Sequence, residues 1–190
     1  MSLVPAFEIG LWNAWILTVI QFLSGYIVFI NKEARGKATS APKLTHKEKI
    51  FRAGQFLYFV VILYSIFVPL KLGTTWFCVG LIIYFLGLVP SVVSYFNFAT
   101  TRLNEPVVKG VYRISRHPQY FFGAFVALLG VGVASASWLI ILLVIIYGIF
   151  QHFVDLAEER TCLEKYGNAY REYMNRTPRY IGVPKSGGKW

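Results

Sequence analysis

The residues best suited to chemistry stand at the two ends of one long apolar run. The segment Arg116–Tyr120, with the sequence Arg-His-Pro-Gln-Tyr, precedes the run, and Glu158 and Glu159 follow it. A hairpin in the run would place an imidazole beside two carboxylates. Charged groups at a membrane boundary often only anchor a helix, but a histidine and two adjacent acids brought together in this way predict a ligand site.

The segment before the run predicts an anion site at the start of a helix. Pro118 suits the first helical turn, because its missing N–H is not needed there. His117 then lies at or just before the N-cap, beside backbone N–H groups and the positive end of the helix dipole. The rings of Tyr112 and Tyr120 can donate further hydrogen bonds to a carboxylate or phosphate. The alternative is that Arg116 and His117 only anchor the helix to lipid headgroups.

The acids after the run are unusual for their position. Glu158 and Glu159 stand where the helix C-terminus and the membrane surface both favour cations. Asp155 lies one turn before Glu159, and like charges four residues apart repel each other. A bound cationic group would explain Glu158. The alternative is the solvated face of a helix that continues to about Tyr166, and we assign Asp155 to that face.

The composition predicts the class of fold. The chain is 56 % hydrophobic, and its apolar residues come in blocks of membrane-spanning length. We expect an all-α integral membrane protein with five spans, at about 11–30, 51–70, 75–98, 118–134 and 137–154. The last two share a run of about 34 residues, which as one helix would rise roughly 51 Å, against about 30 Å for a hydrocarbon core. They should therefore form a tight hairpin that turns at Ala134–Ser137, with cytoplasmic C-terminal helices capping the site.

The basic residues predict the orientation. All but one of the 19 lysines and arginines fall in segments that a five-span arrangement places on one side, and Lys71 is the exception. By the positive-inside rule the N-terminus is outside, and the C-terminus and the site are cytoplasmic. We expect a single multi-pass domain over residues 1–190, in the cell membrane or, in a eukaryote, the endoplasmic reticulum. This topology and contact with membrane lipids explain the net charge of +10, so no nucleic acid partner is expected.

A periodic stripe follows the acids. Leu163, Tyr166, Tyr170 and Tyr173 recur at intervals of three or four, which indicates packing on a pair of cytoplasmic helices hinged at Gly167. These helices would cap the mouth of the hairpin and screen a ligand from water.

Glycines and polar stretches complete the prediction of the fold. Gly130 and Gly132 look like part of a nucleotide loop, but their place near the outer end of the fourth span favours close helix packing. Residues 36–43 are expected to form a flexible cytoplasmic loop, and residues 186–190 a frayed end. The sequence contains no Walker loop, no dinucleotide fingerprint and no metal-binding spacing of its two cysteines.

Several short motifs follow one another along the second half of the chain. They are Gly110-Val111-Tyr112, Arg116-His117-Pro118-Gln119-Tyr120, Gly123, Glu158-Glu159, Leu163, Tyr166-Gly167, Tyr170, Tyr173 and Arg176-Thr177-Pro178. Each motif alone is weak, but the combination is specific. It resembles the isoprenylcysteine carboxyl methyltransferase family, within the wider group that includes the membrane phospholipid methyltransferases. The short five-span form is most similar to the prokaryotic integral membrane methyltransferases of this group.

The resemblance implies S-adenosylmethionine (SAM) as cofactor, S-adenosylhomocysteine as product and a lipidic substrate that arrives from the bilayer. The carboxylate of SAM suits His117, Tyr120 and the helix N-terminus, and Glu158 suits a cationic part. In the family, matching residues line the cofactor pocket, which here gives Asn97, Asn104, Glu105, Val107, Tyr112, His117, Pro118, Gln119, Tyr120 and Glu158. We assign Arg116, Glu159 and Arg176 to the reaction itself, with Arg176 near the substrate.

One departure from the family bears on the substrate. Eukaryotic prenylcysteine enzymes carry a basic residue just upstream of the glutamate pair, whereas this chain has Phe153, Val154 and Asp155 there. A prenylcysteine carboxylate would have to rely on Arg116 or Arg176. We therefore expect another lipid to be preferred.

The sequence is also compatible with two other functions. Lys165–Gly167 and Arg176–Pro184 also resemble the tail of the sterol reductases, which use NADPH and would need a further basic site for its 2′-phosphate. A small non-enzymatic membrane protein, such as a transporter subunit, is the other. The mid-membrane regions are almost uncharged, so no permeation path is visible.

Overall fold

The computed structural model describes residues 8–30 and 45–182, so the loop predicted at 36–43 and the end predicted at 186–190 lie outside the described residues. The helices are α1 Trp15–Ser24, α2 Ile27–Ile30, α4 His46–Gly54, α5 Phe56–Ser65, α6 Thr75–Ala99, η1 Gly110–Arg113, η2 Gln119–Ala127, α7 Leu128–Ala134, α8 Trp138–Tyr166 and α9 Asn168–Arg176. η1 is a 3₁₀ turn, and η2 is wound as a π-helix. A predominantly helical fold is thus confirmed.

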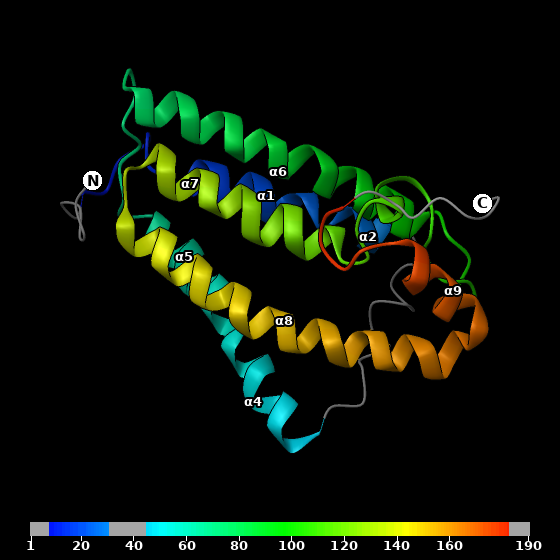
Figure 1. The fold of residues 1–190 in the computed structure, drawn as a ribbon. Helices are drawn as coiled ribbons and strands as arrows, with labels where there is room; N and C mark the ends of the chain where they lie inside the picture. Colours follow the sequence, from blue (N-terminus) through cyan, green and yellow to red (C-terminus); the bar gives the residue numbers. More distant parts are fainter. Residues whose placement is uncertain (1–7, 31–44, 183–190) are drawn as a thin grey trace.

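The helices form two groups that meet along the hairpin (Figure 1). In the first group α6 lies along η2 and α7, with α1 and α2 against them. In the second group α4 and α5 pack against α8. The far end of α8 and the short helix α9 lie at the end of the molecule where the two groups enclose the site described below.

Small residues let α6 approach η2 and α7 closely. A side chain at Gly87 would overlap the backbone of Ala127, and one at Gly130 would overlap the backbone of Tyr84. Tyr84 is 1 % exposed, and its hydroxyl donates to the Leu17 carbonyl at 2.9 Å, which ties α1 to the same pair. The expected packing role of Gly130 is therefore confirmed.

The hairpin turns where the small residues stand. Ala136 takes a left-handed φ of 51° in the turn, and Ser137 caps α8 by accepting a hydrogen bond from the N–H of Ile140 at 3.4 Å. α8 then continues without a break to Tyr166, past the predicted end of the last span at 154. Its final turns therefore carry polar side chains on the same rigid helix as the apolar section.

Two of the five predicted spans correspond to helices that are long and apolar enough to cross a membrane by themselves. These are α6, with 25 residues, and α8, with 29. At 1.5 Å per residue they are roughly 38 Å and 44 Å long. η2 and α7 together form a shorter apolar helix, and α1 and α5 have 10 residues each. The number of spans therefore stays a prediction.

α1 and α5 are joined at one end and separate toward the other. Thr18 and Ser65 share a hydrogen bond of 2.8 Å, and the Asn13 amide donates to the Ile66 carbonyl at 2.8 Å. At the other end α1 is followed by α2, which packs on α6, whereas α5 is preceded by α4, which packs on α8. The two helices therefore diverge away from their shared end (Figure 1).

Side chains fix α4 on α8. Thr45 and Glu48 form a capping box that begins α4. Glu48 also accepts two hydrogen bonds from the Arg160 guanidinium, at 2.8 and 2.9 Å. The ring of Phe51 stacks on that of Phe153 with centroids 4.1 Å apart. One face of α4 is therefore held toward α8.

Candidate functional site

The acids beyond the apolar section of α8 are mostly buried. Asp155 and Glu159, one turn apart on the same face, are 0 % and 3 % exposed. The prediction that Asp155 lies on a solvated face is therefore wrong. Hydrogen-bonding and cationic groups from other segments surround these carboxylates and replace the water that they would otherwise need.

The imidazole of His117 lies among three carboxylates. Its Nε2 lies 3.2 Å from Glu159 Oε1, and its Nδ1 lies 3.5 Å from Asp155 Oδ1 and 3.9 Å from Glu158 Oε2. Burial alone would lower the pKa of His117, but the charge of Asp155 and the hydrogen bond with Glu159 raise it above its usual value. The structure therefore contains the predicted contact between this histidine and the glutamate pair.

The main chain before η2 fixes His117. Pro118 is the N-cap of η2, and its φ of −67° suits a helical start. The His117 N–H donates to Ser115 Oγ at 3.2 Å and to the Arg179 carbonyl at 3.3 Å. The His117 carbonyl accepts from the N–H of Phe121 at 3.0 Å. Bonds on both sides of the residue therefore set the position of the ring.

Residues 177–182, here called the C-terminal strap, complete the cluster around Glu159. The N–H of Arg116 donates to the carbonyls of Pro178 and Arg179, both at 3.1 Å. The Arg179 guanidinium donates to both oxygens of Glu159, from Nε at 3.0 Å and from Nη2 at 2.8 Å. Arg116 Nη2 lies 3.2 Å from Oε1 of the same carboxylate. Glu159 is thus held by arginines from two segments that are distant in the sequence.

Asp155 is held by neutral donors as well as by His117. The Tyr180 hydroxyl of the C-terminal strap donates to Oδ2 at 3.0 Å, and Gln151, one turn earlier on α8, donates to Oδ1 at 2.7 Å. Gln151 in turn accepts from Gln55, between α4 and α5, at 2.8 Å. A continuous polar network therefore joins the C-terminal strap, α8 and the α4–α5 junction.

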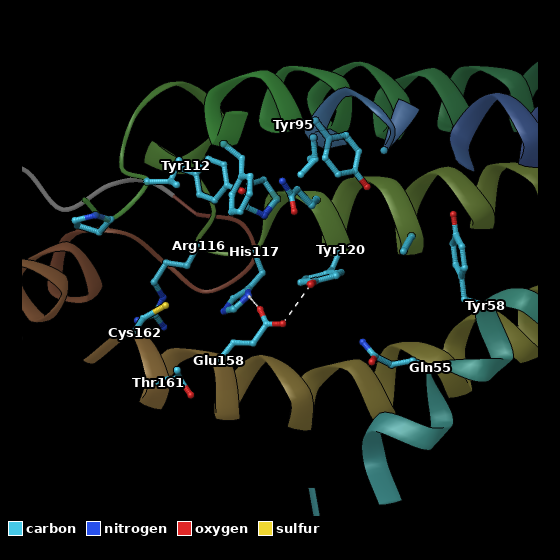
Figure 2. A pocket seen from close by; sticks show the side chains of 18 of the residues that line it. Gln55, Tyr58, Tyr95, Tyr112, Arg116, His117, Tyr120, Glu158, Thr161 and Cys162 are labelled. Carbon is cyan, nitrogen blue, oxygen red and sulfur yellow. Dashed lines mark hydrogen bonds and ion pairs between the residues drawn. The ribbon is translucent and has the colours of Figure 1, made fainter. Parts of the chain in front are cut away.

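Glu158 differs from the other two acids because it faces a cavity. Its Oε1 accepts a hydrogen bond from the Tyr120 hydroxyl at 3.2 Å, and its side chain is 24 % exposed. Figure 2 shows the carboxylate directed toward His117 and Tyr120. Within the part of the chain that the structure describes, it is the one member of the acid cluster that lines the cavity. Glu158 is thus the carboxylate that a bound cation can reach.

Three residues of the cluster also have the spacing of metal ligands. His117, Asp155 and Glu158 offer ligand atoms within 4.8 Å of one another. However, Arg116 and Arg179 bring positive charge to the acid cluster, and the imidazole of His117 already forms a hydrogen bond with Glu159. The arrangement favours pairing among the side chains over a metal ion.

The cavity has a volume of about 910 Å³, near the upper end of the range of about 300–1,000 Å³ for small-molecule sites. One end is charged and contains Arg116, His117 and Glu158. The other end lies toward Tyr58 and Gln55, away from Tyr112 and Arg116 (Figure 2). Further lining residues are Gln21, Phe22, Tyr26, Arg52, Phe59, Tyr95, Tyr147, Cys162 and Lys165.

The tyrosine stripe packs as predicted. Gly167 has a left-handed φ of 56° and separates α8 from α9, so the expected hinge is confirmed. Tyr170 and Tyr173 are 6 % and 5 % exposed, and the Tyr173 hydroxyl donates to the Tyr112 carbonyl at 2.7 Å. With Tyr166, both rings also line the cavity. The stripe therefore covers the charged end of the cavity.

The cavity brings together most of the residues predicted for the cofactor. Val107, Tyr112, His117, Pro118, Gln119, Tyr120 and Glu158 all line it, and so does Arg116 from the group assigned to the reaction. Their common place on one cavity is consistent with a single ligand site.

Other predicted residues do not line this cavity. Asn97 lies against Gly110, Asn104 is exposed, and Glu105 is exposed with Arg102 at 3.8 Å. Glu159 contacts the cluster but not the cavity, and Arg176 pairs with Glu172 at 3.8 Å along α9. The roles assigned to all the predicted site residues stay predictions, and for these five the cavity gives no support.

Sequence reasoning missed four members of the site. Asp155 shares a helix face with Glu159, and that spacing was the available signal for its burial. Arg179 and Tyr180 directly follow the Arg-Thr-Pro motif, which pointed to the segment but not to these side chains. Arg52 stands at the edge of an apolar run, where a basic residue is ordinarily a membrane anchor.

Comparison with known proteins places this site in a family. The phospholipid methyltransferase family model matches residues 64–169, which is more than half of the chain and includes the hairpin and the acid cluster. No curated protein matches the chain at a significant level. The family indicates methyl transfer to a lipid, and the two long apolar helices agree with membrane association. The match agrees with the resemblance of the motifs, and the chain belongs to the phospholipid methyltransferase family.

Proposed function

We propose that the protein is a SAM-dependent methyltransferase whose acceptor is a lipid that reaches the site from the bilayer. The observation that carries this proposal is the cavity, which joins a charged end at Arg116 and Glu158 to an end lined by aromatic residues of α1 and α5. The family match supports methyl transfer to a lipid. A cofactor at the charged end and a lipid at the aromatic end would meet within one enclosed space.

The charged end of the cavity suits the amino acid portion of SAM, which carries an ammonium beside a carboxylate. Glu158 faces the cavity and would hold the cationic part. Arg116 Nε and Gln119 Nε2 are buried and lack a hydrogen-bond partner among the described residues. Because buried donors are nearly always paired, a ligand carboxylate that accepts from both would satisfy them. These two donors beside one open carboxylate therefore fit a zwitterion.

His117 takes a supporting role in this arrangement. Carboxylates already surround its imidazole, so the ring would hold Glu158 in place rather than bind the carboxylate of the cofactor. The hydrogen bond from Tyr120 fixes Glu158 from the other side. Such support keeps a binding group in position before its ligand arrives.

The acceptor would reach the cavity between α1 and α5. Phe22, Tyr26 and Phe59 line the cavity and are also 39 %, 53 % and 50 % exposed. Side chains that border both the cavity and the outer surface mark an opening, and this one lies where α1 and α5 diverge. Exposed aromatic rings suit contact with a hydrocarbon chain. A lipid could thus rest on these rings with its headgroup toward Glu158.

The protein's part in the reaction is alignment and exclusion of water. SAM would supply a methyl group bonded to a sulfonium sulfur. A nucleophile in line with the C–S bond would form a new bond to the methyl carbon, and the electron pair of the C–S bond would remain on sulfur. The tyrosine stripe would keep water from the reacting atoms, and the cavity walls would hold the acceptor in line. A carboxylate acceptor has no proton to lose and therefore needs no general base.

The proposal includes the five-span topology with the site on the cytoplasmic side. α6, α8 and the η2–α7 helix account for three spans, and the α1–α2 and α4–α5 segments would supply the other two with their flanking residues. The basic residues support an outer N-terminus, and the charged end of the cavity would then open toward the cytoplasm, where SAM is available.

Calorimetric titration of detergent-purified protein tests the cofactor. S-adenosylhomocysteine should bind, and NADPH, the ligand of the reductase alternative, should not. Glu158→Gln should weaken S-adenosylhomocysteine binding about 10- to 100-fold, because hydrogen bonds to charged groups contribute about 1.5–3 kcal/mol. Glu164→Gln, which changes an exposed acid on the same helix, is the matched control and should bind normally. Equal affinities of the two variants would refute the site, and binding of NADPH alone would refute the function.

Radiolabelled methyl transfer from SAM into total membrane extract tests the acceptor. Label should appear in the lipid fraction, and a farnesylcysteine analogue should be a poor substrate. Label confined to water-soluble products would contradict access from the bilayer, and efficient turnover of the farnesylcysteine analogue would contradict the expected preference for another lipid.

A further inference from the structure

α4 directs one cationic side chain into the cavity. Glu48, Phe51, Arg52 and Gln55 stand at intervals of three and four and therefore share one face of the helix. Three of them bind side chains of α8, through an ion pair, a ring stack and an amide hydrogen bond. Arg52 lines the cavity instead. The contacts of its neighbours hold the backbone of Arg52 in a fixed place beside the cavity.

Arg52 lacks the partners that the other arginines of this region have. Its Nε is buried and has no hydrogen-bond partner among the described residues. In the same part of the chain, Arg116, Arg160 and Arg179 each lie within 4 Å of a carboxylate, whereas Arg52 makes no such ion pair and acts on Glu158 only through its charge at longer range. A buried donor without a partner is unfavourable, and a charged one is more so. The side chain is therefore suited to an anion that enters the cavity.

We propose that Arg52 binds an anionic group, a carboxylate or a phosphate, in the headgroup of the lipid acceptor. This inference rests on the proposed function. Arg52 lines the cavity one turn before Gln55, and its positive charge also reaches Glu158 at the charged end. The carboxylate of the cofactor has its own donors in Arg116 Nε and Gln119 Nε2. The anion at Arg52 would thus belong to the acceptor and would set the position of the atom that is methylated.

The proposal predicts a preference among amphiphiles of equal chain length. An anionic headgroup would pair with the guanidinium, whereas an uncharged alcohol would leave it buried without a partner. The contact with the rings of Phe22, Tyr26 and Phe59 would be the same for both. The difference in affinity therefore reports on Arg52 and not on the hydrocarbon chain.

Competition binding in phosphatidylcholine nanodiscs tests this preference. Dodecanoate, dodecyl phosphate and dodecanol would each displace an uncharged fluorescent fatty alcohol, with and without S-adenosylhomocysteine. At least one of the anions should compete at a concentration about 10-fold or more below that of dodecanol, as expected for a hydrogen bond to a charged group. The comparison of dodecanoate with dodecyl phosphate distinguishes a carboxylate from a phosphate headgroup.

Matched variants on α4 assign the effect to one residue. Arg52→Gln should abolish the preference for anions, and Arg52→Lys should retain part of it, which also shows that the fold tolerates a change here. Lys49→Gln, which removes an exposed positive charge from the same helix, should behave as the wild type. The affinity for S-adenosylhomocysteine should stay within about twofold in all three variants.

Three results would overturn the proposal. The first is that dodecanol competes as well as both anions in the wild type. The second is that Arg52→Gln keeps the wild-type preference for anions. The third is that Arg52→Gln loses as much affinity for S-adenosylhomocysteine as it loses for the anionic amphiphiles. The last would assign Arg52 to the carboxylate of the cofactor. Because the competition is also measured without S-adenosylhomocysteine, failure of the wild type to bind that ligand would refute the proposed function and leave the test of Arg52 intact.

Discussion

Replacing Glu159 by glutamine should strongly destabilise the fold, although the two side chains have nearly the same shape. The carboxylate is 3 % exposed, and it receives two hydrogen bonds from Arg179 and further contacts from Arg116 and His117. An amide is neutral and has one acceptor oxygen, and its NH₂ group would face cationic donors. The substitution therefore leaves positive charges in a buried cluster without their counter-ion.

The magnitude follows from the environment of this carboxyl, which lies beyond the predicted end of the last span. Burial alone would raise the pKa of Glu159, but hydrogen bonds from His117 and Arg179 and the charges of His117 and Arg116 lower it from 4.5 to about 2. At about 1.4 kcal/mol per pKa unit, the shift corresponds to about 3 kcal/mol at neutral pH. Breaking buried ion pairs costs about 3–5 kcal/mol in other proteins. We expect a loss of about 3 kcal/mol.

The pH dependence of this loss has a definite sign. Because the pKa of Glu159 is lowered in the folded state, its contribution is complete above the unfolded value near 4.5 and is lost as the pH falls through about 2. The difference in stability between the wild type and Glu159→Gln should therefore narrow as the pH decreases across this interval.

Equilibrium unfolding in mixed micelles with increasing sodium dodecyl sulfate, followed by tryptophan fluorescence, measures the effect. Glu105→Gln is the matched control, because Glu105 also faces one arginine, Arg102, but its side chain is 57 % exposed. An exposed pair of this kind contributes about 0–1 kcal/mol, so the control should lose less than about 1 kcal/mol. Equal losses in the two variants, or no narrowing at low pH, would refute the account of the buried cluster.

Two further predictions concern the fold. Gly130→Val should destabilise the protein by about 1–3 kcal/mol or more in the same unfolding assay, because the new side chain would overlap the backbone of Tyr84 and force α6 and α7 apart; an unchanged midpoint would contradict this close packing. In a variant without the native cysteines, a cysteine at Leu72 should react with an impermeant thiol reagent applied outside intact cells, whereas one at Arg171 should react only after permeabilisation. Both positions are exposed, so the reverse pattern would reverse the proposed orientation.

The centre of the site could be predicted because a hairpin constrains which residues meet. Once the small residues at Ala134–Ser137 mark a turn between two antiparallel helices, the ends of the run must lie side by side. His117 was therefore predicted to lie near Glu158 and Glu159, although a hairpin does not fix the rotation of each helix about its axis. The hinge at Gly167 was also predicted, and the structure adds its positive φ, which a glycine between two helices readily adopts.

The remaining members of the site depend on contacts between distant segments, which local spacing does not determine. Arg179 and Tyr180 reach the acids only because α9 turns back along the molecule after the hinge. Arg52 reaches the cavity because α4 packs on α8 through its other face residues. Asp155 is buried because distant segments pack around it. From its charge alone, it was predicted to face water. In each case the residue type could be read from the sequence, but the distant residue that it contacts could not.

The C-terminal strap has a consequence for how the protein is made. A ribosome synthesises the chain from its N-terminus, so Asp155 and Glu159 emerge before Arg179 and Tyr180 exist. In the proposed five-span topology the hairpin can therefore enter the bilayer while these acids are still hydrated, and no unpaired carboxylate has to be buried during insertion. The strap then supplies partners to these acids after the preceding helices have been made, so that the pocket is completed only when this later segment folds back onto it.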